Sequence, residues 1–329
     1  MDWILVISRA VEAAIGTEAV IYALAAIGLN VHFGYTGLLN FGQAAFLAVG
    51  AYSIAVTVST FGLPFFLGVG IGLALAVVLA LLLGIPTLRL RADYLAIVTI
   101  ATAEIVRLVV RAVALEETFG GTDGLQGFAD SFYALSVFDP NRQYGIGPIS
   151  FSGNIMWVLT VGWILVAVCC LLLFMLMKSP WGRVLKAIRE DEDAVRSLGK
   201  NVFSYKMQSL VLGGVIGALG GFIFALSRAA VQPDVFSTEL TFYAYTVLIL
   251  GGAARIFGPV VGSMIFWFLF ILTTTALEEA VRHGVITFIT VPQVGAIRYA
   301  LIGLGLILLL IYRPQGIFGD KREIALDAR

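Results

Sequence analysis

Long apolar stretches alternate with short polar segments along the chain, and this alternation predicts helices that cross a membrane. An α-helix needs about 20 mostly apolar residues to span the hydrocarbon core of a bilayer. Nine runs approach that length, with soft boundaries: 19–33, 40–58, 61–85, 95–113, 155–177, 207–226, 240–254, 259–277 and 297–312. The run 240–254 is short, so we expect it to tilt little or to be broken. We predict an all-α polytopic transmembrane bundle of about nine spans with broken or re-entrant segments.

The charged residues between these runs are distributed unevenly. The segment 178–206 carries seven basic residues, the tail 313–329 carries four, and Arg89 and Arg91 follow the third run. The long segment 114–153 has one basic residue against five acids. Basic residues are retained on the cytoplasmic side of membrane proteins. We therefore predict a cytoplasmic loop at 178–206, a cytoplasmic tail at 313–329, an extracytoplasmic loop at 114–153 and, with nine crossings, an outside N-terminus.

The composition agrees with a membrane protein and disfavours several other classes. Of 329 residues, 60% are hydrophobic and 13% are charged, and 21 basic residues balance 21 acids. Soluble domains average about 45–50% apolar and about 25% charged residues. So few charges do not suit a disordered chain, a disulfide scaffold or a nucleic-acid-binding protein. Because no segment is long enough for a separate soluble domain, we predict one transmembrane domain over 1–329.

Residues that could carry chemistry of their own are scarce. The two cysteines, Cys169 and Cys170, are adjacent within one apolar run, and we interpret them as small packing or lipid-facing residues. The two histidines, His32 and His283, lie near the ends of apolar runs, where we expect interfacial positions. A zinc site needs three or four ligands, so we expect no metal site. The N-terminus lacks the features of a signal peptide, and we expect it to be retained.

The segment 114–153 contains turn-forming sequences at 120–124 and 139–141. Part of it would pack on the membrane face through four apolar side chains: Phe132, Tyr133, Val137 and Phe138. We expect this segment to form a cap or a docking surface.

The segment after the fifth run has the features of one amphipathic helix over 182–198. Ser179 can cap its start, Pro180 fits the first helical position, and Gly199 can end it. Five apolar residues at helical spacing form one stripe: Val184, Leu185, Ile188, Val195 and Leu198. Three i, i+4 pairs of opposite charge can form on its surface: Lys186–Glu190, Arg189–Asp193 and Glu192–Arg196.

Two surfaces could receive this helix. An amphipathic helix can lie on lipid headgroups, but an anionic cytoplasmic leaflet would repel the acidic run 190–193. An apolar stripe bordered by both charge signs suits a groove on a protein partner. We favour the protein partner, although the residues alone leave the membrane surface open.

The same segment, GRVLKAIREDEDAVRSLG at 182–199, resembles the EAA-type coupling loop of ABC importer permeases, most closely that of the branched-chain amino-acid permease family. The other matching motifs are GYTGLLNFGQAAFLAVGAY at 34–52, LRLRADYLAIVTIATAEIVRLV at 88–109, GGAARIFGPVVGS at 251–263 and YRPQGIFG at 312–319. All five stand in the family's order, and they resemble the larger of its two paired permeases. The chain departs near Ala92, where the family often has glycine, and near Ala101–Thr102, where it often has a glycine-phenylalanine pair. Urea and short-chain amide permeases share these motifs, so they remain an alternative.

The resemblance implies the transmembrane subunit of an ATP-driven importer for branched-chain or other apolar amino acids, within the lipid bilayer of the bacterial cytoplasmic membrane. It implies a second homologous permease, two ABC ATPase subunits and an extracytoplasmic binding protein that would meet 114–153. ATP and Mg²⁺ would bind to the ATPase subunits, so this chain would hold no cofactor and would not be an enzyme. In agreement, Gly199-Lys200 is followed by Asn201 rather than by the Ser or Thr of a P-loop.

In this resemblance, the helix 182–198 would insert into a groove of the ATPase and transmit its closure to the membrane segments, as rigid elements do. The residues expected to couple are Gly182, Arg183, Ala187, Arg189, Glu190, Asp191, Glu192, Leu198 and Gly199.

Charged residues inside the fourth run are candidates for the translocation path. Glu104, Arg107 and Arg111 are spaced i, i+3 and i+7, so they share one helical face. A charge at mid-membrane costs roughly 2.5–3.5 kcal/mol on insertion scales and usually faces protein or water. The alternative is a Glu104–Arg107 ion pair that locks helices together, with Arg111 reaching the interface.

Two glycine-rich stretches are candidates for broken segments, which in transporters often expose backbone groups to substrate. The stretch 34–50 contains Asn40, Phe41, Gln43 and Phe46, which could form a weak site for a zwitterion with an apolar side chain; packing is an equal alternative. The stretch 251–262 contains Arg255 and Pro259. Small residues four positions apart predict close helix packing at Gly213, Gly217, Gly221, Gly258 and Gly262.

Two other classes of function remain to be weighed. A self-sufficient secondary transporter or channel would need no ATPase. A membrane enzyme is disfavoured, because the sequence places no His, Cys or paired-carboxylate constellation at a span end.

Overall fold

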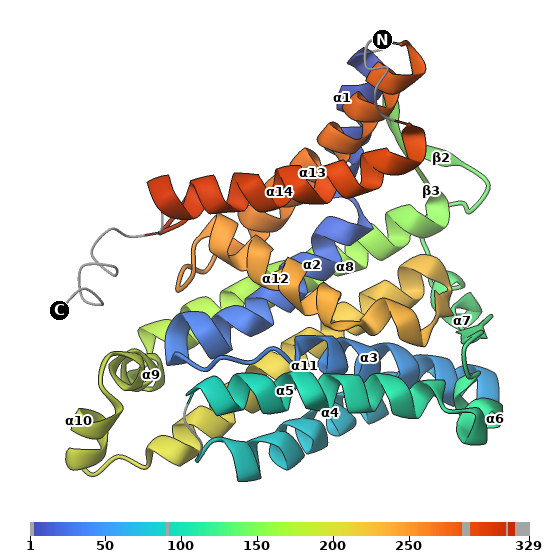
Figure 1. The fold of residues 1–329 in the computed structure, drawn as a ribbon. Coiled ribbons are helices and arrows are strands. Elements are labelled where there is room, and N and C mark those ends of the chain that lie inside the picture. The colour runs from blue at the N-terminus through green and yellow to red at the C-terminus, as the bar shows by residue number, and fades with distance from the viewer. Residues whose placement is uncertain (1–2, 90–91, 285–289, 314, 320–329) are drawn as a thin grey trace.

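The structure is a bundle of long helices that lie side by side along one axis (Figure 1). This computed structural model describes residues 3–89, 92–284, 290–313 and 315–319. The long helices are α1 (Trp3–Ile15), α2 (Thr17–Leu29), α3 (Gln43–Ala55), α4 (Phe65–Thr87), α5 (Ala92–Arg111), α8 (Gly153–Lys178), α11 (Val202–Arg228), α12 (Thr238–Gly251), α13 (Gly258–Arg282) and α14 (Val291–Tyr312). Two π-helices, η1 (Asn30–Tyr35) and η2 (Val56–Thr60), continue α2 and α3.

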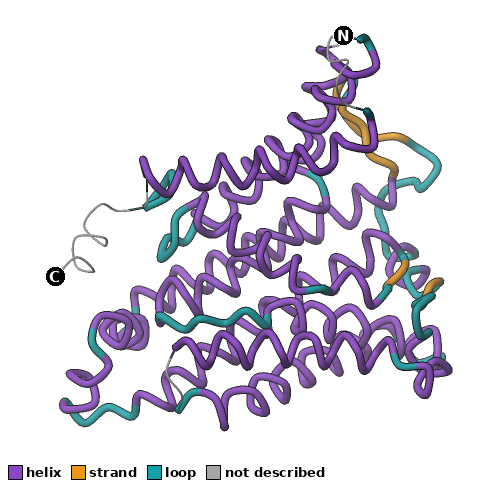
Figure 2. Tube along the Cα trace, in the orientation of Figure 1, coloured by secondary structure: helices purple, strands orange, loops and turns teal. Residues whose placement is uncertain are grey.

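Short elements gather at the two ends of the bundle (Figures 1 and 2). At one end, here named the α9–α10 end, are α9 (Pro180–Glu190) and α10 (Glu192–Ser197). At the opposite end, named the hairpin end, are α6 (Glu116–Phe119), α7 (Asp130–Tyr133) and the antiparallel hairpin of β2 (Gln143–Ile146) and β3 (Ile149–Ser152). The remaining elements are η3 (Val113–Leu115), η4 (Pro233–Phe236) and the antiparallel pair of β1 (Leu125–Gln126) and β4 (Ala230–Val231). Segments 114–153 and 178–206 therefore lie at opposite ends, as a membrane between them requires.

The predicted polytopic helical bundle is confirmed, because each of the nine apolar runs lies mostly within a helix. Helix α1 precedes the first run and is an additional element. Among the described residues, six helical segments are long and apolar enough to cross a membrane: Trp3–Tyr35, Gln43–Thr60, Phe65–Thr87, Gly153–Lys178, Val202–Arg228 and Gly258–Arg282.

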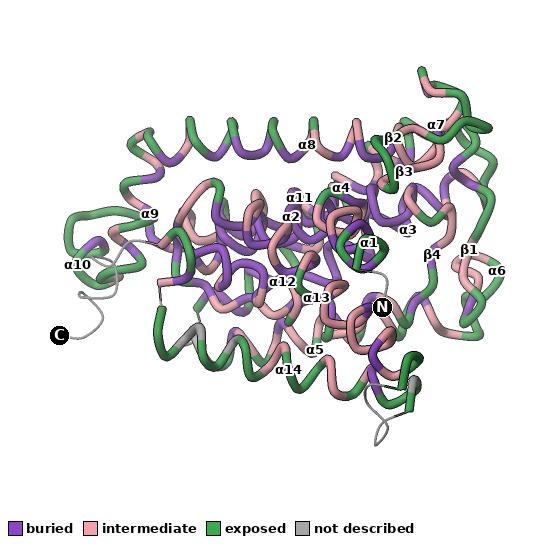
Figure 3. The backbone as a smooth tube through the Cα atoms, turned by 90° about the horizontal axis from the view of Figure 1, so that it is seen from above, coloured by how far each residue is buried: buried purple, intermediate pink, exposed green. Residues whose placement is uncertain are grey.

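Helices α2, α3 and α11 form the centre of the bundle, and α8 and α14 lie at its edges (Figure 3). Every residue of α2 from Ala19 onward is buried. Small residues allow this, because they let backbones touch. A Cβ added at Gly221 would lie 2.0 Å from the carbonyl oxygen of Leu47, and one added at Gly50 would lie 2.3 Å from that of Ala218.

The outer helices carry most of the exposed apolar side chains. On α4, α5 and α8 these include Leu82, Ile97 and Met175, which are 68%, 64% and 63% exposed. Apolar surface of this extent suits contact with lipid or with another membrane protein.

The chain is interrupted at two places inside the bundle. After η1 it leaves the helical conformation until Gln43, and Gly37 adopts a left-handed φ of 74°. The short run 240–254 ends in the second interruption, between α12 and α13, where Gly252 and Ala254 have φ of 106° and 58°. The expected broken segments are therefore both present.

The side chain of Asn30 joins the two interruptions. It is fully buried at the start of η1. Its Oδ1 accepts a hydrogen bond from the backbone N–H of Ala254 (2.8 Å), and its Nδ2 donates to the carbonyl oxygen of Arg255 (2.7 Å). One amide thus satisfies a donor and an acceptor of the second interruption.

Three sequence expectations need correction. His32 is fully buried rather than interfacial, because both ring nitrogens have partners within the bundle. Cys169 and Cys170 are buried, so the packing interpretation holds and the lipid-facing one does not. At the hairpin end Phe132 is buried as expected, but Val137 is 81% exposed and packs little.

We predict that Gly221→Ala lowers the free energy of unfolding by about 1–3 kcal/mol, the usual cost of overpacking a filled interior. The new methyl group would meet backbone that cannot move aside. The matched control is Gly70→Ala on α4, where a Cβ would have nothing within 4 Å. Thermal unfolding of the two purified variants measures the difference, and equal midpoints would contradict the prediction.

We predict that Asn30→Ala destabilises the α12–α13 interruption, because the N–H of Ala254 loses its acceptor. A buried polar group left unsatisfied costs about 1–3 kcal/mol. Hydrogen exchange at residues 252–257 should become faster, whereas Asn141→Ala in the exposed hairpin-end loop should leave it unchanged. Unaltered exchange in Asn30→Ala would show that other contacts hold this turn.

Candidate coupling and translocation site

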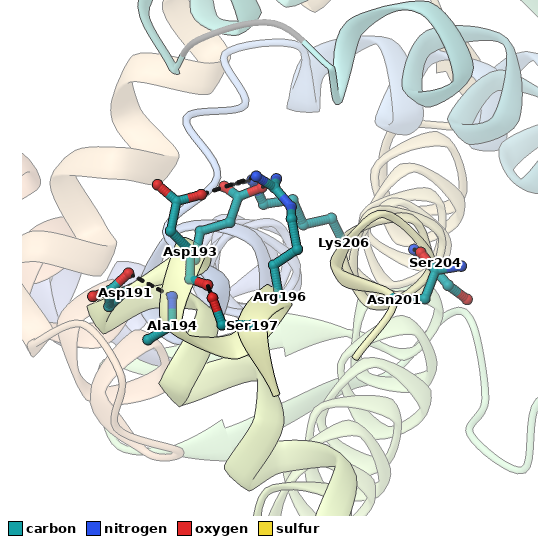
Figure 4. A network of polar contacts seen from close by, with 9 residues as sticks. Asp191, Asp193, Ala194, Arg196, Ser197, Asn201, Ser204 and Lys206 are labelled. Atoms are coloured by element: carbon teal, nitrogen blue, oxygen red, sulfur yellow. Dashed lines mark hydrogen bonds and ion pairs between the residues drawn. The ribbon is translucent and has the colours of Figure 1, made fainter. Parts of the chain in front are cut away.

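The coupling element at the α9–α10 end consists of two helices, so the predicted single helix over 182–198 is wrong. Asp191 has an extended backbone between them. Its Oδ1 accepts a hydrogen bond from the backbone N–H of Ala194 at 2.9 Å (Figure 4). Asp191 is therefore the N-cap of α10, and a capped new start replaces continuation of α9.

The apolar stripe of this element faces the chain's own bundle. Leu185, Ile188 and Val195 are buried, and the last two form a small cluster with Val202 of α11. Leu198, which the sequence places in the stripe, is 80% exposed. The apolar side is therefore already occupied, and a partner would meet the opposite, charged side together with Leu198.

The sequence predicted the end of the α9–α10 element at Gly199 correctly, but not the role of Ser179 at its start. Ser179 occupies the N-cap position of α9, but its hydroxyl donates to the carbonyl oxygen of Leu176 (2.6 Å) instead of capping the helix. Gly199 has a φ of 78°, the left-handed conformation expected after a helix. Gly182 is buried at the bend after α8, where a Cβ would lie 2.5 Å from the Cα of Met177.

Charged residues tie α10 to α11 (Figure 4). The carboxylate of Glu192 pairs with Arg196 at 2.9 Å, one of the three predicted i, i+4 pairs, and with Lys206 of α11. Arg196 also pairs with Asp193 at 2.9 Å. The exposed pairs of Arg196 contribute little stability, about 0–1 kcal/mol, whereas the largely buried Lys206 side chain fixes α10 against α11.

Helix α9 directly contacts the first interruption. The Arg189 guanidinium donates to the carbonyl oxygen of Gly34 at 2.7 Å. The Lys186 ammonium lies 5.8 Å from the centre of the Tyr35 ring. Gly37 also packs against Arg189, and its left-handed φ of 74° is a conformation that favours glycine. Helix α9 therefore contacts η1 directly, without an intermediate element.

A buried polar network holds the first interruption in place. The Asn40 amide donates to Nδ1 of His32 (3.0 Å), so Nε2 of this ring carries the proton and donates to the carbonyl oxygen of Leu210 (3.1 Å). The Asn40 Oδ1 accepts from the N–H of Gly42 (2.8 Å), and the Tyr245 hydroxyl donates to the Asn40 carbonyl oxygen (2.9 Å). Asn40 therefore joins η1 to α12, and His32 joins η1 to α11.

The other path candidates of this stretch differ in position. Gln43 is fully buried, and its amide donates to the carbonyl oxygens of Ala25 and Gly213, both at 3.3 Å. Phe46 is also fully buried. Phe41 is only partly buried, and its ring lies 4.7 Å from that of Tyr245. Of the four candidates, Phe41 is the one that can meet a passing molecule without a rearrangement of the bundle.

The charges of α5 form a cluster with η4 near the hairpin end. Arg107 pairs with Glu104 (Nε to Oε2, 3.0 Å) and with Asp234 of η4 (2.7 Å). Arg111 pairs with the same Asp234 carboxylate at 2.9 Å. The ion pair foreseen within α5 is present, and Arg111 has a carboxylate partner. Glu104 and Asp234 remain 40% and 60% exposed, so this face of α5 suits water or protein rather than lipid.

The glycines predicted to pack helices lie at close contacts with side chains or backbone of neighbouring segments. A Cβ at Gly213 would meet His32 and Gly28, and one at Gly217 would meet Gln43. At the second interruption, a Cβ at Gly258 would lie 2.3 Å from the carbonyl oxygen of Gly252, and one at Gly262 would lie 2.2 Å from that of Val247.

The remaining coupling candidates lie mainly on the exposed side of α9 and α10. Arg183, Arg189, Glu190 and Asp191 are exposed there. Ala187 is partly buried against the small apolar cluster of Ile188. Together with Leu198, these residues form the surface that is open to a partner.

Sequence reasoning missed Asn30, Asp234 and the role of His32. A signal existed for Asn30 and His32, because polar side chains within an apolar run must find partners at membrane depth. The signal for Asp234 was weaker. The three charged residues of the fourth run required a further counter-charge, but the sequence alone does not say which segment supplies it.

Comparison with known proteins shows the family to which the chain belongs. The family model described as branched-chain amino acid transport system / permease component matches residues 13–312. The high-affinity branched-chain amino acid transport system permease protein LivM of Salmonella typhimurium is 28% identical over 97% of this chain and 72% of its own length. A probable LivM of Methanocaldococcus jannaschii is 27% identical over 92% of this chain and 91% of its own.

The same comparison finds the other type of permease. LivH of Escherichia coli, also a branched-chain amino acid transport permease, is 25% identical over 91% of both chains. The family match covers most of the chain, including both interruptions and the α9–α10 element. The chain therefore belongs to the family of branched-chain amino acid transport system permease components.

Proposed function

We propose that the chain is the transmembrane subunit of an ATP-driven importer for branched-chain or other apolar amino acids. The observation that carries the proposal is the α9–α10 element, which presents a charged surface at one end of the bundle and contacts η1 through Arg189. A transporter that works alone has no need of such a surface. Membership in the family and the printed roles of LivM and LivH support the substrate class.

The partners follow from this role. A second homologous permease would complete the path, two ABC ATPase subunits holding ATP and Mg²⁺ would dock on α9 and α10, and a binding protein would deliver substrate to segment 114–153. The α9–α10 end is then cytoplasmic, and the hairpin end faces outward. The bacterial cytoplasmic membrane is the location that this assembly requires.

Closure of the ATPases would move α9. The contacts of η1 indicate which neighbouring segments would be displaced with it. Arg189 of α9 is bonded to Gly34 of η1 and also packs against Gly37, which follows η1. Within η1, Asn30 is bonded to the turn between α12 and α13, and His32 is bonded to α11. A shift of η1 would therefore reach both interruptions together, as rigid elements transmit discrete movements.

We predict that Arg189→Glu uncouples ATP hydrolysis from uptake. The substitution removes the donor to the Gly34 carbonyl oxygen and places a carboxylate against it. The contact between α9 and η1 is therefore weakened. In reconstituted vesicles, uptake per ATP hydrolysed should fall at least about tenfold, because 1.4 kcal/mol of lost coupling is already a factor of ten. Lys200→Glu reverses an exposed charge outside both helices and should leave the ratio unchanged. Normal coupling in Arg189→Glu would refute this route.

We predict that the complete transporter imports leucine and valine and that urea does not compete with them. The measurement is uptake of labelled leucine in a strain that lacks other amino-acid transporters, with each competitor in excess. Competition by urea but not by valine would instead assign the chain to the urea and amide branch of the family.

A further inference from the structure

A pocket of about 510 Å³ opens at the α9–α10 end, where α4 ends and α11 begins (Figure 1). Three segments line it: Leu88 and Arg89 after α4, Glu192 and Arg196 of α10, and residues 200–203 at the start of α11. No residue of α9 or η1 is part of this lining. The pocket is therefore separate from the contact of α9 with η1.

The acids at this pocket already have basic partners. Glu192 lines the pocket, and its carboxylate pairs with Arg196 at 2.9 Å and with Lys206 of α11. The neighbouring Asp193 pairs with Arg196 at 2.9 Å (Figure 4). These two acids and two bases balance one another, so together they add no net charge to the pocket.

Two further cations, Arg89 and Lys200, line the pocket and form no ion pair with a described residue. The Arg89 guanidinium lies 5.6 Å from the centre of the Phe203 ring, a cation–π contact that holds it at the pocket wall. The N-terminus of α11, at Val202, adds a partial positive charge. The pocket therefore has a positive charge that the described part of the chain leaves uncompensated, and it suits an anion.

The outer face of α4 continues from this pocket as exposed apolar surface. Ile85 and Leu82, three positions apart on one helical face, are 55% and 68% exposed. A free anion or an acidic protein segment would meet only the charges, whereas a phospholipid has an anionic headgroup and apolar chains and matches both surfaces. Basic pockets between transmembrane helices are typical sites for anionic lipid headgroups.

We propose that this pocket binds the phosphate group of an anionic phospholipid, with Arg89 and Lys200 as its charge partners and the acyl chains along α4. The headgroup would bridge the end of α4 and the turn between α10 and α11. This inference goes beyond the proposed function and does not depend on which substrate is transported. Because no residue of α9 or η1 lines the pocket, its occupancy should leave the uptake per ATP hydrolysed unchanged.

The first test locates the lipid with a tryptophan reporter in the full chain. Ile85→Trp places an indole on the exposed face of α4, and Met175→Trp is the matched control on α8, at a position that is 63% exposed near the same end of the bundle. The protein is held in phosphatidylcholine nanodiscs that contain a minor fraction of lipid with brominated chains, which quench a neighbouring indole. The unmodified chain, with its five tryptophans, corrects for background.

Brominated phosphatidylglycerol should quench Ile85→Trp several-fold more than brominated phosphatidylcholine does, because only the anionic lipid is concentrated at the pocket. The two lipids should quench Met175→Trp equally. Equal quenching of Ile85→Trp by the two lipids would overturn the inference.

The second test removes one charge of the pocket. Arg89→Gln should lower the affinity for phosphatidylglycerol about tenfold, as measured by the same quenching, which corresponds to about 1.4 kcal/mol. Lys178→Gln is the matched control, since it removes an exposed charge at the end of α8 that does not line the pocket. Equal losses in both variants would show a general attraction of this end for anionic lipid and would overturn the inference, as would an unchanged affinity in Arg89→Gln.

Two additions test the competing occupants. Excess inorganic phosphate, compared with chloride at equal ionic strength, should not displace phosphatidylglycerol, because it lacks the chains that lie on α4. The ATPase subunits of the proposed transporter should likewise leave the quenching of Ile85→Trp unchanged. Displacement by phosphate would assign the pocket to a free anion, and displacement by the ATPase would assign it to an acidic protein segment; either result would overturn the inference.

Discussion

The need to satisfy backbone polar groups inside a bilayer governs this structure. Hydrocarbon offers no hydrogen-bond partner, so a chain can leave the helical conformation there only where protein groups replace water. Both interruptions meet this condition through amide side chains. Asn30 satisfies the turn between α12 and α13, and Asn40 satisfies its own loop while bonded to His32. Asn30 belongs to η1, and Asn40 is bonded to His32 of η1. This short element therefore links the two interruptions.

The glycine contacts make that arrangement possible. Asn30, His32 and Gln43 can reach backbone groups of other helices only because α2, α3 and α11 approach within backbone contact at positions such as Gly213. A side chain at Gly213 would occupy the space of the His32 ring. The same small residues therefore allow both the close packing of these helices and the hydrogen bonds between them. Both contribute to the structure of the bundle centre.

The sequence predicted what depends on local pattern and missed what depends on distant contacts. Apolar runs identified the helices, and glycine-rich stretches identified both interruptions. The break at Asp191 was missed, although a local acceptor for the N–H of Ala194 is a readable signal. The α11 partner of His32 and the α5 partners of Asp234 could not be identified from the sequence, because Leu210 and Arg107 lie 178 and 127 positions away. For the same reason, the four candidates of stretch 34–50 could not be sorted into buried Asn40, Gln43 and Phe46 and accessible Phe41.

The inward direction of the apolar stripe changes how coupling is understood. If Leu185, Ile188 and Val195 were offered to a partner, the ATPase would hold the element by burial and could pull it from the bundle. Because these side chains are buried against this chain, they hold α9 and α10 on the membrane helices, and a proposed partner would meet mainly charge. Contacts made by charge are easily formed and released, whereas the apolar contact persists. In the proposed transporter, force applied to the charged side would therefore be carried into η1 and would not separate the element from the bundle.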